Sequence, residues 1–533
     1  MGGGAAALTV ASELAGANFR VCVLESGGTA EHEGYKDLSS GAVIGNHSLN
    51  LQLARWRQFG GAANRWLIEL GNGARGVRYT PLDEIDFEQR DWLPFSGWPF
   101  RKSDLEPFYR RAQQICRIGP YSYEPEDWED AQTLRLPLPS DQIVTKMFQF
   151  GVKTVFTRDI PDQLRQAKNV AVYLHANVTE IATDETAKIA TRVKVACLEG
   201  SRFDVAAKYF VLATGGTENA RLLLLSDCVL AAGLGNGYDV VGRFFNVHPQ
   251  FHHDRFTPAR HDLFSRARLY DLRRVNQVWV MGRLGLARAV MEREHLRNLG
   301  VMLLPREEDY WSKTEKEFIS KRKEPASKTF APFHRLARVV RSRSQALTRV
   351  RAYLPKLKPG QPALPESSFK LTLERGGWSK LPDIDNKYLT FEMISLVEQA
   401  PDPANRVMLG SELDPAGARR LELHWRWSDS DHKQVVRSRT RIGQALAQSG
   451  LGTFELVDAP PKHPDSSHHI GSTRMHHNPR LGVVDSNCQV HDVVNLFVAG
   501  SSVFPTGGFA NPTLTIVALA ARLAEHIKTV CLA

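Results

Sequence analysis

Residues 2–28 read GGGAAALTVASELAGANFRVCVLESGG, and this stretch decides the class of fold. Three glycines run into an alanine-rich segment that favours a helix. Residues 19–24 then form a short apolar run that is typical of a buried strand, closed by a turn with two glycines. The order of glycine-rich turn, helix and strand predicts the beginning of an α/β unit that binds a dinucleotide.

The turn itself matches the pattern G-x-G-x-x-[GA] at Gly2, Gly4 and Ala7. The first glycine allows a sharp bend, the second lets the backbone approach a pyrophosphate, and the third position must be small for close helix packing. The helix N-terminus would offer N–H groups and partial positive charge to the phosphates. Glu25 ends the next strand, where a carboxylate can accept hydrogen bonds from a ribose diol. The alternative is an ordinary Gly-Ala helix start with a surface glutamate.

The strand that should precede these glycines is missing, because the chain begins at Met1. A parallel nucleotide-binding sheet without that strand lacks its central member. We therefore expect a gap in the sheet, and we favour a translation start upstream of Met1 over loss of the strand.

Composition excludes several classes of protein. Apolar residues make up 42% and charged residues 24% of 533 residues, which is the balance of a globular protein with a sizeable core. No apolar run of about 18 residues is present, and no charged and apolar leader begins the chain. The six cysteines are scattered and never form a C-x-x-C pair, which argues against a zinc ribbon or disulfide framework. These features predict a cytoplasmic protein.

The net charge of +10 is concentrated in one segment. Residues 313–358 contain 14 Lys and Arg against three Glu, a net +11, so the rest of the chain is nearly neutral. This distribution argues against a nucleic-acid-binding face. We interpret residues 306–366 as a basic helical or disordered insertion, which either contacts a membrane or partner protein or is a solvated excursion.

The C-terminal region holds the second informative pattern. Residues 467–475 read SHHIGSTRM, and residues 495–505 read NLFVAGSSVFP, which predicts a strand that ends in a polar turn. Residues 510–516 read ANPTLTI and open a helix that we expect to reach about residue 527. Pro512 suits the first helical position and Asn511 suits the N-cap.

With these motifs the chain resembles the glucose–methanol–choline (GMC) oxidoreductases, a family of FAD enzymes. The similarity extends over most of the chain outside residues 306–366, and the Asn-Pro-Thr variant is most like the pyranose-oxidase branch. Further matching segments are residues 57–66 (RQFGGAANRW), 81–87 (PLDEIDF), 96–99 (SGWP), 104–109 (DLEPFY) and 213–221 (ATGGTENAR).

The resemblance implies an α/β fold in which a Rossmann-like FAD/NAD(P)-binding domain is interleaved with a substrate domain of antiparallel sheet and helices. We expect residues 1–235 and 465–533 in the FAD-binding domain. Residues 236–305 and 367–464 are then expected in the substrate-binding domain.

The family pattern also assigns roles. His468 corresponds to the histidine that faces the flavin, Asn511 to its partner, and Val178 to the residue whose backbone meets the adenine. The expected cofactor-binding residues are Gly2, Gly4, Ala7, Glu25, Gly60, Gly61, Asn64, Val178, Gly215, Gly500, Ser501, Pro512 and Thr513. Some relatives attach FAD through a histidine in the Gly-Gly loop, but Arg65 stands at that position here, which predicts noncovalent FAD.

The chemistry agrees with these residue types. Removing hydride from a carbinol carbon requires the hydroxyl proton to leave, and a histidine can accept it. Asn511 can hold the substrate oxygen without competing for that proton. The helix after Pro512 would direct its positive end at the flavin ring, where negative charge accumulates. We therefore predict oxidation of a CH–OH group of a sugar, polyol or other small alcohol, with an electron acceptor that the sequence does not identify.

Other interpretations stay open at this stage. His468 can be a structural loop histidine, and Asn511 can be only a helix cap. His476 and His477 follow closely, but no carboxylate or thiol stands at ligand spacing, so we predict no metal site. Rival functions are a hydroxynitrile-lyase-type enzyme or a non-catalytic flavoprotein relic on the same fold, and a nicotinamide-dependent dehydrogenase that would leave the C-terminal motifs unexplained.

Overall fold

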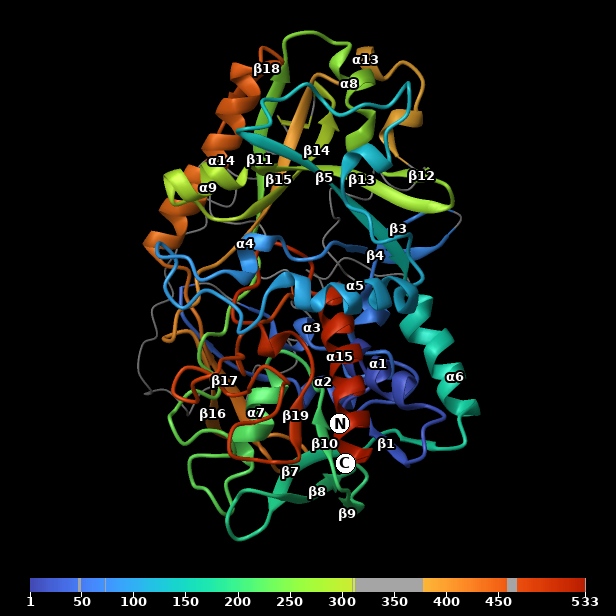
Figure 1. Ribbon diagram of the computed structural model, residues 1–533, viewed down its shortest axis with the longest axis vertical. Helices are drawn as coiled ribbons and strands as arrows, with labels where there is room; N and C mark the ends of the chain where they lie inside the picture. The colour runs from blue at the N-terminus through green and yellow to red at the C-terminus, as the bar shows by residue number, and fades with distance from the viewer. Residues whose placement is uncertain (47–48, 72, 309, 312–376, 458–466, 533) are drawn as a thin grey trace, which may run out of the picture.

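The structure is a computed structural model that describes residues 1–46, 49–71, 73–308, 310–311, 377–457 and 467–532. Most of the predicted insertion 306–366 therefore lies outside the described residues. Figure 1 shows two parts stacked along the long axis, with both chain ends in the lower part and a large sheet in the upper part.

The lower part contains the predicted glycine-rich unit. Helix α1 (Ala5–Leu14) follows the glycines, and β1 (Val21–Leu24) follows α1. Strand β1 pairs in parallel with β6 (Val170–Tyr173), and β10 (Phe210–Leu212) pairs in parallel with β19 (Leu496–Val498). Among the described residues, these four strands form two separate two-stranded sheets.

Helices cover this parallel layer. Helix α1 packs along α15 (Thr513–Leu532), and α15 also contacts α5 (Lys102–Cys116) (Figure 1). Small apolar residues of α1, including Ala7 and Ala11, are buried. Helix α5 forms despite Pro107, and residues such as Leu105, Tyr109 and Ala112 are buried along it.

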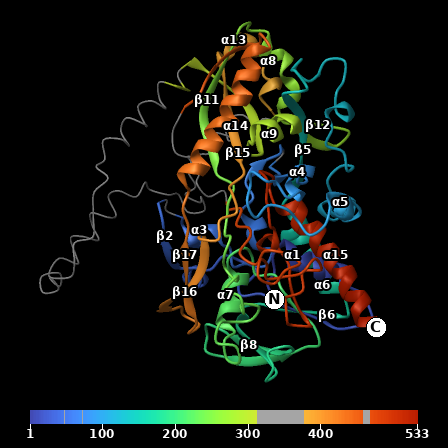
Figure 2. The same ribbon diagram turned by 60° about the vertical axis from the view of Figure 1, so that its left-hand side comes forward.

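Two smaller sheets complete the lower part. Strands β7 (Asn177–Thr183), β8 (Ala190–Ala196) and β9 (Arg202–Ala206) form an antiparallel sheet. Strands β16 (Arg406–Leu413) and β17 (Arg419–His424) form a hairpin that pairs in parallel with β2 (Gly41–Ile44). Figure 2 shows this second sheet and α15 on opposite sides of the lower part.

The upper part is built on a sheet whose order is β18-β11-β15-β14-β13-β5-β4-β3, with β12 beside β13. Its pairings are antiparallel. Its strands are β3 (Ile68–Glu69), β4 (Arg75–Tyr79), β5 (Ile143–Val152), β11 (Gln250–Pro258), β12 (Arg273–Val275), β13 (Val278–Leu286), β14 (Leu299–Arg306), β15 (Thr390–Val397) and β18 (Gly452–Glu455). Every residue of β14 and β15 is buried, so both faces of the sheet are covered at its centre.

Helix α14 (Asp429–Gln448) is the longest described helix of the upper part. Ser428 caps it by accepting a hydrogen bond from the Asp431 backbone, and the Asp431 side chain accepts in return from the Ser428 backbone. The short helices are α2 (Glu33–Asp37), α3 (Leu51–Ala54), α4 (Glu84–Phe87), α6 (Ile160–Gln166), α7 (Glu218–Leu225), α8 (Leu263–Arg266), α9 (Arg288–Glu294) and α13 (Ile384–Lys387).

The two expected domains are interleaved more finely than the sequence ranges suggest. Strands β3, β4 and β5 come from the range expected in the FAD-binding domain, yet they belong to the large antiparallel sheet. Strands β16 and β17 come from the range expected in the substrate domain, yet they pair with β2. Strand partners far apart in the chain decide these placements.

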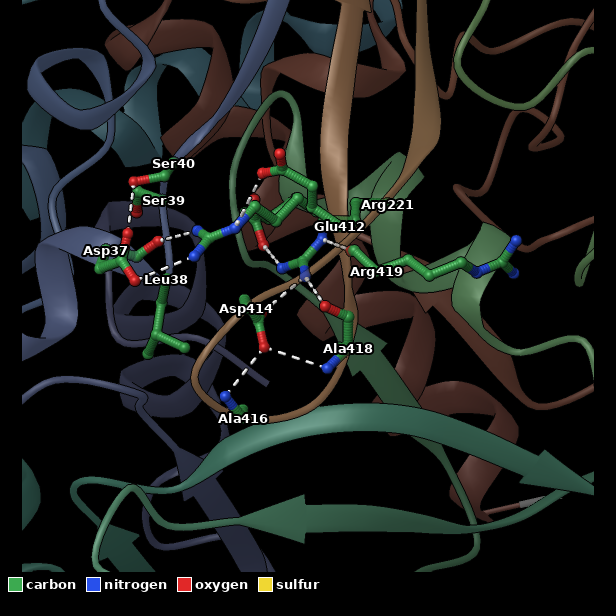
Figure 3. Close-up of polar contacts among 12 residues, drawn as sticks. Asp37, Leu38, Ser39, Ser40, Arg221, Glu412, Asp414, Ala416, Ala418 and Arg419 are labelled. Atoms are coloured by element: carbon green, nitrogen blue, oxygen red, sulfur yellow. Dashed lines mark hydrogen bonds and ion pairs between the residues drawn. The ribbon is translucent and has the colours of Figure 1, made fainter. Parts of the chain in front are cut away.

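A buried arginine joins the β16–β17 hairpin to α7 (Figure 3). Arg221 donates to the Arg419 carbonyl at 2.8 Å and to the Asp414 carboxylate at 2.6 Å. The same arginine reaches Glu218 at 3.2 Å. Because Arg221 and Asp414 are both buried, each needs the other as a charge partner.

Candidate active site

The segment that carries His468 is fixed by backbone bonds to two distant loops. Ile470 exchanges backbone hydrogen bonds with Asn246, both at 3.0 Å. Thr473 donates its backbone N–H to the Ser502 carbonyl at 2.9 Å. His468 therefore lies where the loop before β11 meets the turn that follows β19.

The structure brings His468 and Asn511 together. The Asn511 amide nitrogen lies 3.1 Å from His468 Nε2. On the other side of the ring, His468 Nδ1 lies 3.3 Å from Nδ1 of His248. A tautomer with the proton on His468 Nδ1 satisfies both contacts, because Nδ1 then donates to His248 and Nε2 accepts from Asn511. In that form Nε2 is the basic atom of the site.

Burial keeps this histidine neutral. Desolvation lowers the pKa of His468 well below its usual range, and the neighbouring His248 and Arg78 lower it further. Burial also lowers the pKa of His248 to about 4. Both rings are therefore neutral near pH 7, and a neutral imidazole can accept a proton.

Asn511 is not acting as a helix cap in this arrangement. Helix α15 begins at Thr513, and its first bond runs from the Ile516 N–H to the Pro512 carbonyl at 2.8 Å. The Asn511 side-chain oxygen is buried, and within the described part of the chain it has no hydrogen-bond partner. A buried polar atom of this kind is costly unless a ligand satisfies it. This observation fits a cofactor or substrate bound beside Asn511.

The large sheet reaches the same place through an aromatic contact. The Arg283 guanidinium of β13 lies 4.3 Å from the ring centre of Phe509, two residues before Asn511. Arg283 also donates to Asp83 at 3.3 Å. Strands of the upper part thus form a wall next to the Asn511 turn.

The turn before Asn511 rests on a buried carboxyl. A Cβ at Gly508, whose φ is +53°, would lie 2.3 Å from a carboxyl oxygen of Asp86. Asp86 accepts a hydrogen bond from Asn298 at 2.9 Å, and burial raises its pKa to about 7. Glycine is required at this position because no side chain fits between the turn and the carboxyl.

The glycine-rich loop is built for close backbone approach. A Cβ at Gly2, whose φ is +98°, would lie 2.3 Å from the Ala213 carbonyl. A Cβ at Gly61 would lie 2.7 Å from the Gly4 Cα, so the two glycine loops touch through their backbones. Gly4 is the N-cap of α1 and makes no side-chain cap bond. The arrangement leaves the start of α1 suited to a pyrophosphate.

Glu25 lies beside this loop. One carboxylate oxygen accepts the Gly27 N–H at 2.7 Å, and the other would lie 2.8 Å from a Cβ at Gly3. Only 5% of the residue is exposed, and desolvation raises its pKa despite the hydrogen bonds it accepts. The position after β1 and next to the glycines suits contact with a ribose.

The second glycine loop is held by Asn64. Its side-chain amide donates to the Phe59 carbonyl at 3.1 Å and to the Gly61 carbonyl at 3.0 Å. Gly60 donates its N–H to the Gly3 carbonyl at 2.8 Å, which connects the two loops directly. Asn64 thus shapes the loop from within.

The remaining expected cofactor residues lie along the same chain of contacts. Ser501 donates its hydroxyl to the His469 carbonyl at 2.7 Å, and a Cβ at Gly216 would lie 2.3 Å from that same carbonyl. Gly216 follows β10, against which Gly2 packs, so the glycine-rich loop and the His468 segment share one framework. Ala7 is buried in α1, Gly215 and Gly500 have φ of +102° and +125°, Val178 lies in β7, and Pro512 and Thr513 begin α15.

Sequence reasoning missed His248. It lies in a turn before β11, 220 residues from His468, and carries no motif that marks it. The only local feature of the sequence is that Pro249 follows His248, and this pair of residues does not indicate a functional site. Within the described residues, no group of three or more His, Cys, Asp or Glu could hold a metal ion. In the part of the chain that the structure describes, no helix is long and apolar enough to cross a membrane.

Comparison with known proteins gives a consistent result. Residues 401–520 match the GMC oxidoreductase family model. The chain is 34% identical over 131 residues to the fructose dehydrogenase large subunit of Gluconobacter japonicus, covering 24% of each chain. It is 30% identical over 132 residues to pyranose 2-oxidase of Lyophyllum shimeji, covering 24% of this chain and 21% of the relative. These matches thus span about a quarter of the length of the curated relatives.

A solved FAD-dependent oxidoreductase from Chaetomium thermophilum resembles the whole structure, with a TM-score of 0.53 and 16% identity over 99% of this chain and 98% of that one. The chain therefore has the same fold as that solved protein, which confirms the predicted fold class. Residues 401–520 carry the match to the GMC oxidoreductase family, and the resemblance drawn from the sequence motifs is confirmed.

Proposed function

We propose that this protein binds FAD and oxidises a CH–OH group of a sugar, polyol or other small alcohol. The observation that carries the proposal is the contact between His468 Nε2 and the Asn511 amide at the start of α15. A partly buried neutral base and a neutral hydrogen-bonding partner are the two groups that alcohol oxidation requires from the protein.

Bound FAD would supply the hydride acceptor of this reaction. The residues fit the cofactor, because the Gly2–Gly4 and Gly60–Gly61 loops bring backbone without side chains to the start of α1, and Glu25 lies next to them. The buried side-chain oxygen of Asn511 has no hydrogen-bond partner within the described residues, and a group bound in the same site would supply one.

The protein side of the reaction follows from the geometry. His468 Nε2 takes the hydroxyl proton of the substrate while its Nδ1–H donates to His248. Asn511 holds the substrate oxygen so that the carbinol hydrogen is presented in one orientation. The positive end of α15 stabilises negative charge that develops beside it. The names of the relatives, a fructose dehydrogenase and a pyranose oxidase, support a sugar-like substrate.

We further propose that FAD is held without a covalent bond. Arg65, at the position where some relatives carry a linking histidine, stacks its guanidinium 4.4 Å from the ring centre of Trp56. A guanidinium in that position offers no nucleophile for attachment. Acid precipitation should release the flavin into the supernatant, and flavin that stays with the precipitate would overturn this point.

The decisive experiment is a visible absorption spectrum before and after anaerobic addition of sugars and polyols. Flavin bands that bleach with one class of compound would establish the cofactor and the reaction. A yellow protein that no alcohol bleaches would exclude the oxidation and favour a lyase-type function. Oxygen, a quinone or a cytochrome added to the bleached protein would then identify the electron acceptor.

A further inference from the structure

Two arginines share one face of the large sheet. In the pairing of β4 with β5, Arg78 lies opposite Phe150. In the pairing of β13 with β5, Arg283 lies opposite Lys146. Residues two apart on a strand share a face, so Phe148 of β5 is on the same face as both arginines. The two guanidinium groups accordingly lie 5.2 Å and 5.7 Å from the centre of the Phe148 ring.

This face adjoins the reacting groups of the site. Arg283 also lies 4.3 Å from the ring centre of Phe509, and that ring rests on β14, where a Cβ at Gly300 would lie 2.5 Å from it. Arg78 is one of the charges that lower the pKa of His468, so its guanidinium acts on the base. His468 itself is half-buried, which leaves it accessible to a small molecule.

Both arginines are almost completely buried. The exposed fraction is 6% for Arg78 and 2% for Arg283. Desolvation is the largest cause of the lowered pKa of each side chain, and it lowers the pKa of Arg78 to about 10. Two like charges on one ring, in a region with little water, are costly in free energy, and an anion bound beside them reduces that cost.

The contacts of Arg283 leave one of its donors available. It donates to Asp83 at 3.3 Å, and the Asp83 side chain is 30% exposed. Asp86 also acts on Arg283, but burial raises the pKa of Asp86 to about 7, so that carboxyl is partly protonated near pH 7. The Nε atom of Arg283 is buried and has no hydrogen-bond partner within the described residues. Arg283 can therefore bind a further oxygen.

Arg78 contacts soft, weakly polar groups. One of its Nη atoms lies against the sulfur of Met302, and its guanidinium lies over the Phe148 ring. A thioether is a weak acceptor, and the face of a ring stabilises a cation by only about 0.5–2 kcal/mol. An oxyanion that replaced the thioether contact would make a stronger, charge-assisted hydrogen bond to Arg78.

We propose that the substrate is a sugar acid or another polyhydroxy carboxylate, whose carboxylate binds to Arg78 and Arg283. A hydroxyl of the same molecule then lies between His468 and Asn511, and this inference rests on the proposed function. The two oxygens of a carboxylate lie in one plane, which matches the donors along the edge of a guanidinium. Arginines that hold one end of the substrate also fix which CH–OH group reaches the base.

The reaction leaves the carboxylate unchanged. The carbinol carbon loses its hydride to bound FAD, the hydroxyl proton goes to Nε2 of His468, and a C=O bond forms. The bound carboxylate also assists the base, because its negative charge offsets the effect of Arg78 on His468 and raises the pKa of that ring. An acid substrate should therefore increase the rate of flavin reduction as well as the affinity.

The test compares acids with neutral counterparts on the FAD-loaded protein. Methyl glycosides of glucose, galactose and mannose are compared with the corresponding methyl uronosides and their uronamides, which differ at a single carbon. Anaerobic stopped-flow absorbance should give a second-order rate constant of flavin reduction about 10–100-fold higher for the acids, because hydrogen bonds to charged groups are the stronger ones. The 6-phosphates of the same sugars test for a phosphate site, and faster reduction by them than by the acids would overturn the assignment of a carboxylate.

Two variants connect the preference to the arginines. Arg78→Met and Arg283→Met replace each cation by an apolar side chain, so the ratio of the rate constants for acid and amide should fall toward one. Arg260→Met is the matched control, since that side chain is 77% exposed and pairs with Asp262, and it should keep the ratio of the parent. A ratio that stays high in both test variants would overturn the inference and leave the arginines with a structural role only.

A binding measurement does not depend on turnover. Cyclohexanecarboxylate carries the anion without a hydroxyl and should raise the unfolding temperature of the FAD-loaded protein, whereas cyclohexanecarboxamide should not. Equal shifts with both compounds would overturn the inference. Neutral glycosides that reduce the flavin as fast as the acids would also overturn it, and would leave the proposed oxidation intact. If no compound bleached the flavin, the oxidation itself would fail, and the inference with it.

Discussion

The side-chain amide nitrogen of Asn511 lies 3.1 Å from Nε2 of His468, although 43 residues separate them in the chain. One residue belongs to a loop held against Asn246, and the other immediately precedes Pro512 at the start of α15. The pair therefore joins two segments whose proximity the sequence indicates only through the order of its motifs. Its geometry, together with the burial of Asn511 and the desolvation of His468, leads to the following expectations.

Replacing His468 by alanine should slow flavin reduction by about 10²–10⁴-fold, because the proton acceptor is lost. The FAD content should stay unchanged, since His468 is not part of the glycine loops. Anaerobic stopped-flow absorbance measures the rate, and His477→Ala is the matched control because that histidine is exposed. A near-normal rate in His468→Ala would remove His468 as the base.

The rate of flavin reduction should be nearly constant between pH 8 and pH 6. Burial lowers the pKa of His468 well below 6.5, so the ring stays neutral and able to accept a proton throughout this range. Asn511→Asp should place a negative charge beside the ring and raise that pKa, so that the rate falls on acidification. A wild-type rate that already falls below pH 7 would contradict the pKa lowering.

His248 should make the protein less stable in acid. Its pKa is about 4 in the folded state, below the 6.5 of the unfolded chain, so the unfolded chain binds the proton first as the pH falls. The stability that neutral His248 contributes is fully present above pH 6.5 and is lost toward pH 4. The free energy of unfolding therefore falls by up to about 3 kcal/mol over this range. Urea unfolding at pH 7 and pH 5 should show a smaller loss in His248→Asn than in the wild type. His261→Asn, at an exposed position, should lose as much as the wild type.

Gly61→Ala should weaken FAD binding and lower the unfolding temperature. Its Cβ would lie 2.7 Å from the Gly4 Cα, in addition to the strain of a φ of +55°. Gly73→Ala is the control, since Gly73 has a φ of +73° but nothing within 4 Å of its Cβ position. The control should cost only about 1–2 kcal/mol. Flavin content and calorimetry of both variants separate backbone strain from contact between the loops, and equal effects would argue against the contact.

Arg221→Ala should destabilise the protein by about 3–5 kcal/mol, because it leaves Asp414 buried without its charge partner. Arg419→Ala is the control (Figure 3), since that side chain is 43% exposed and pairs with the partly exposed Asp227. An exposed pair of this kind contributes about 1 kcal/mol or less. Denaturant unfolding compares the two, and similar losses would show that the Arg221 contacts add little.

The sequence was sufficient where the signal is local. The helix expected after the glycines is α1 (Ala5–Leu14), and the strand expected at residues 19–24 is β1 (Val21–Leu24). Both depend on neighbouring residues, because a glycine-rich turn, a run of alanines and a short apolar run each restrict their own backbone. The family motifs added the pairing of His468 with Asn511, which no periodicity could have predicted.

By itself, then, the sequence determined the fold class, the family resemblance of its motifs and the glycine-rich start, since these depend on local backbone preference and motif order. Only the tertiary structure decided that β3, β4 and β5 belong to the antiparallel sheet and that His248 completes the contacts of His468. It also decided that Met1 and Gly2 bond to both β1 and β10. Such contacts join residues hundreds of positions apart, and their stability comes from burial and shared hydrogen bonds that no short stretch of chain encodes.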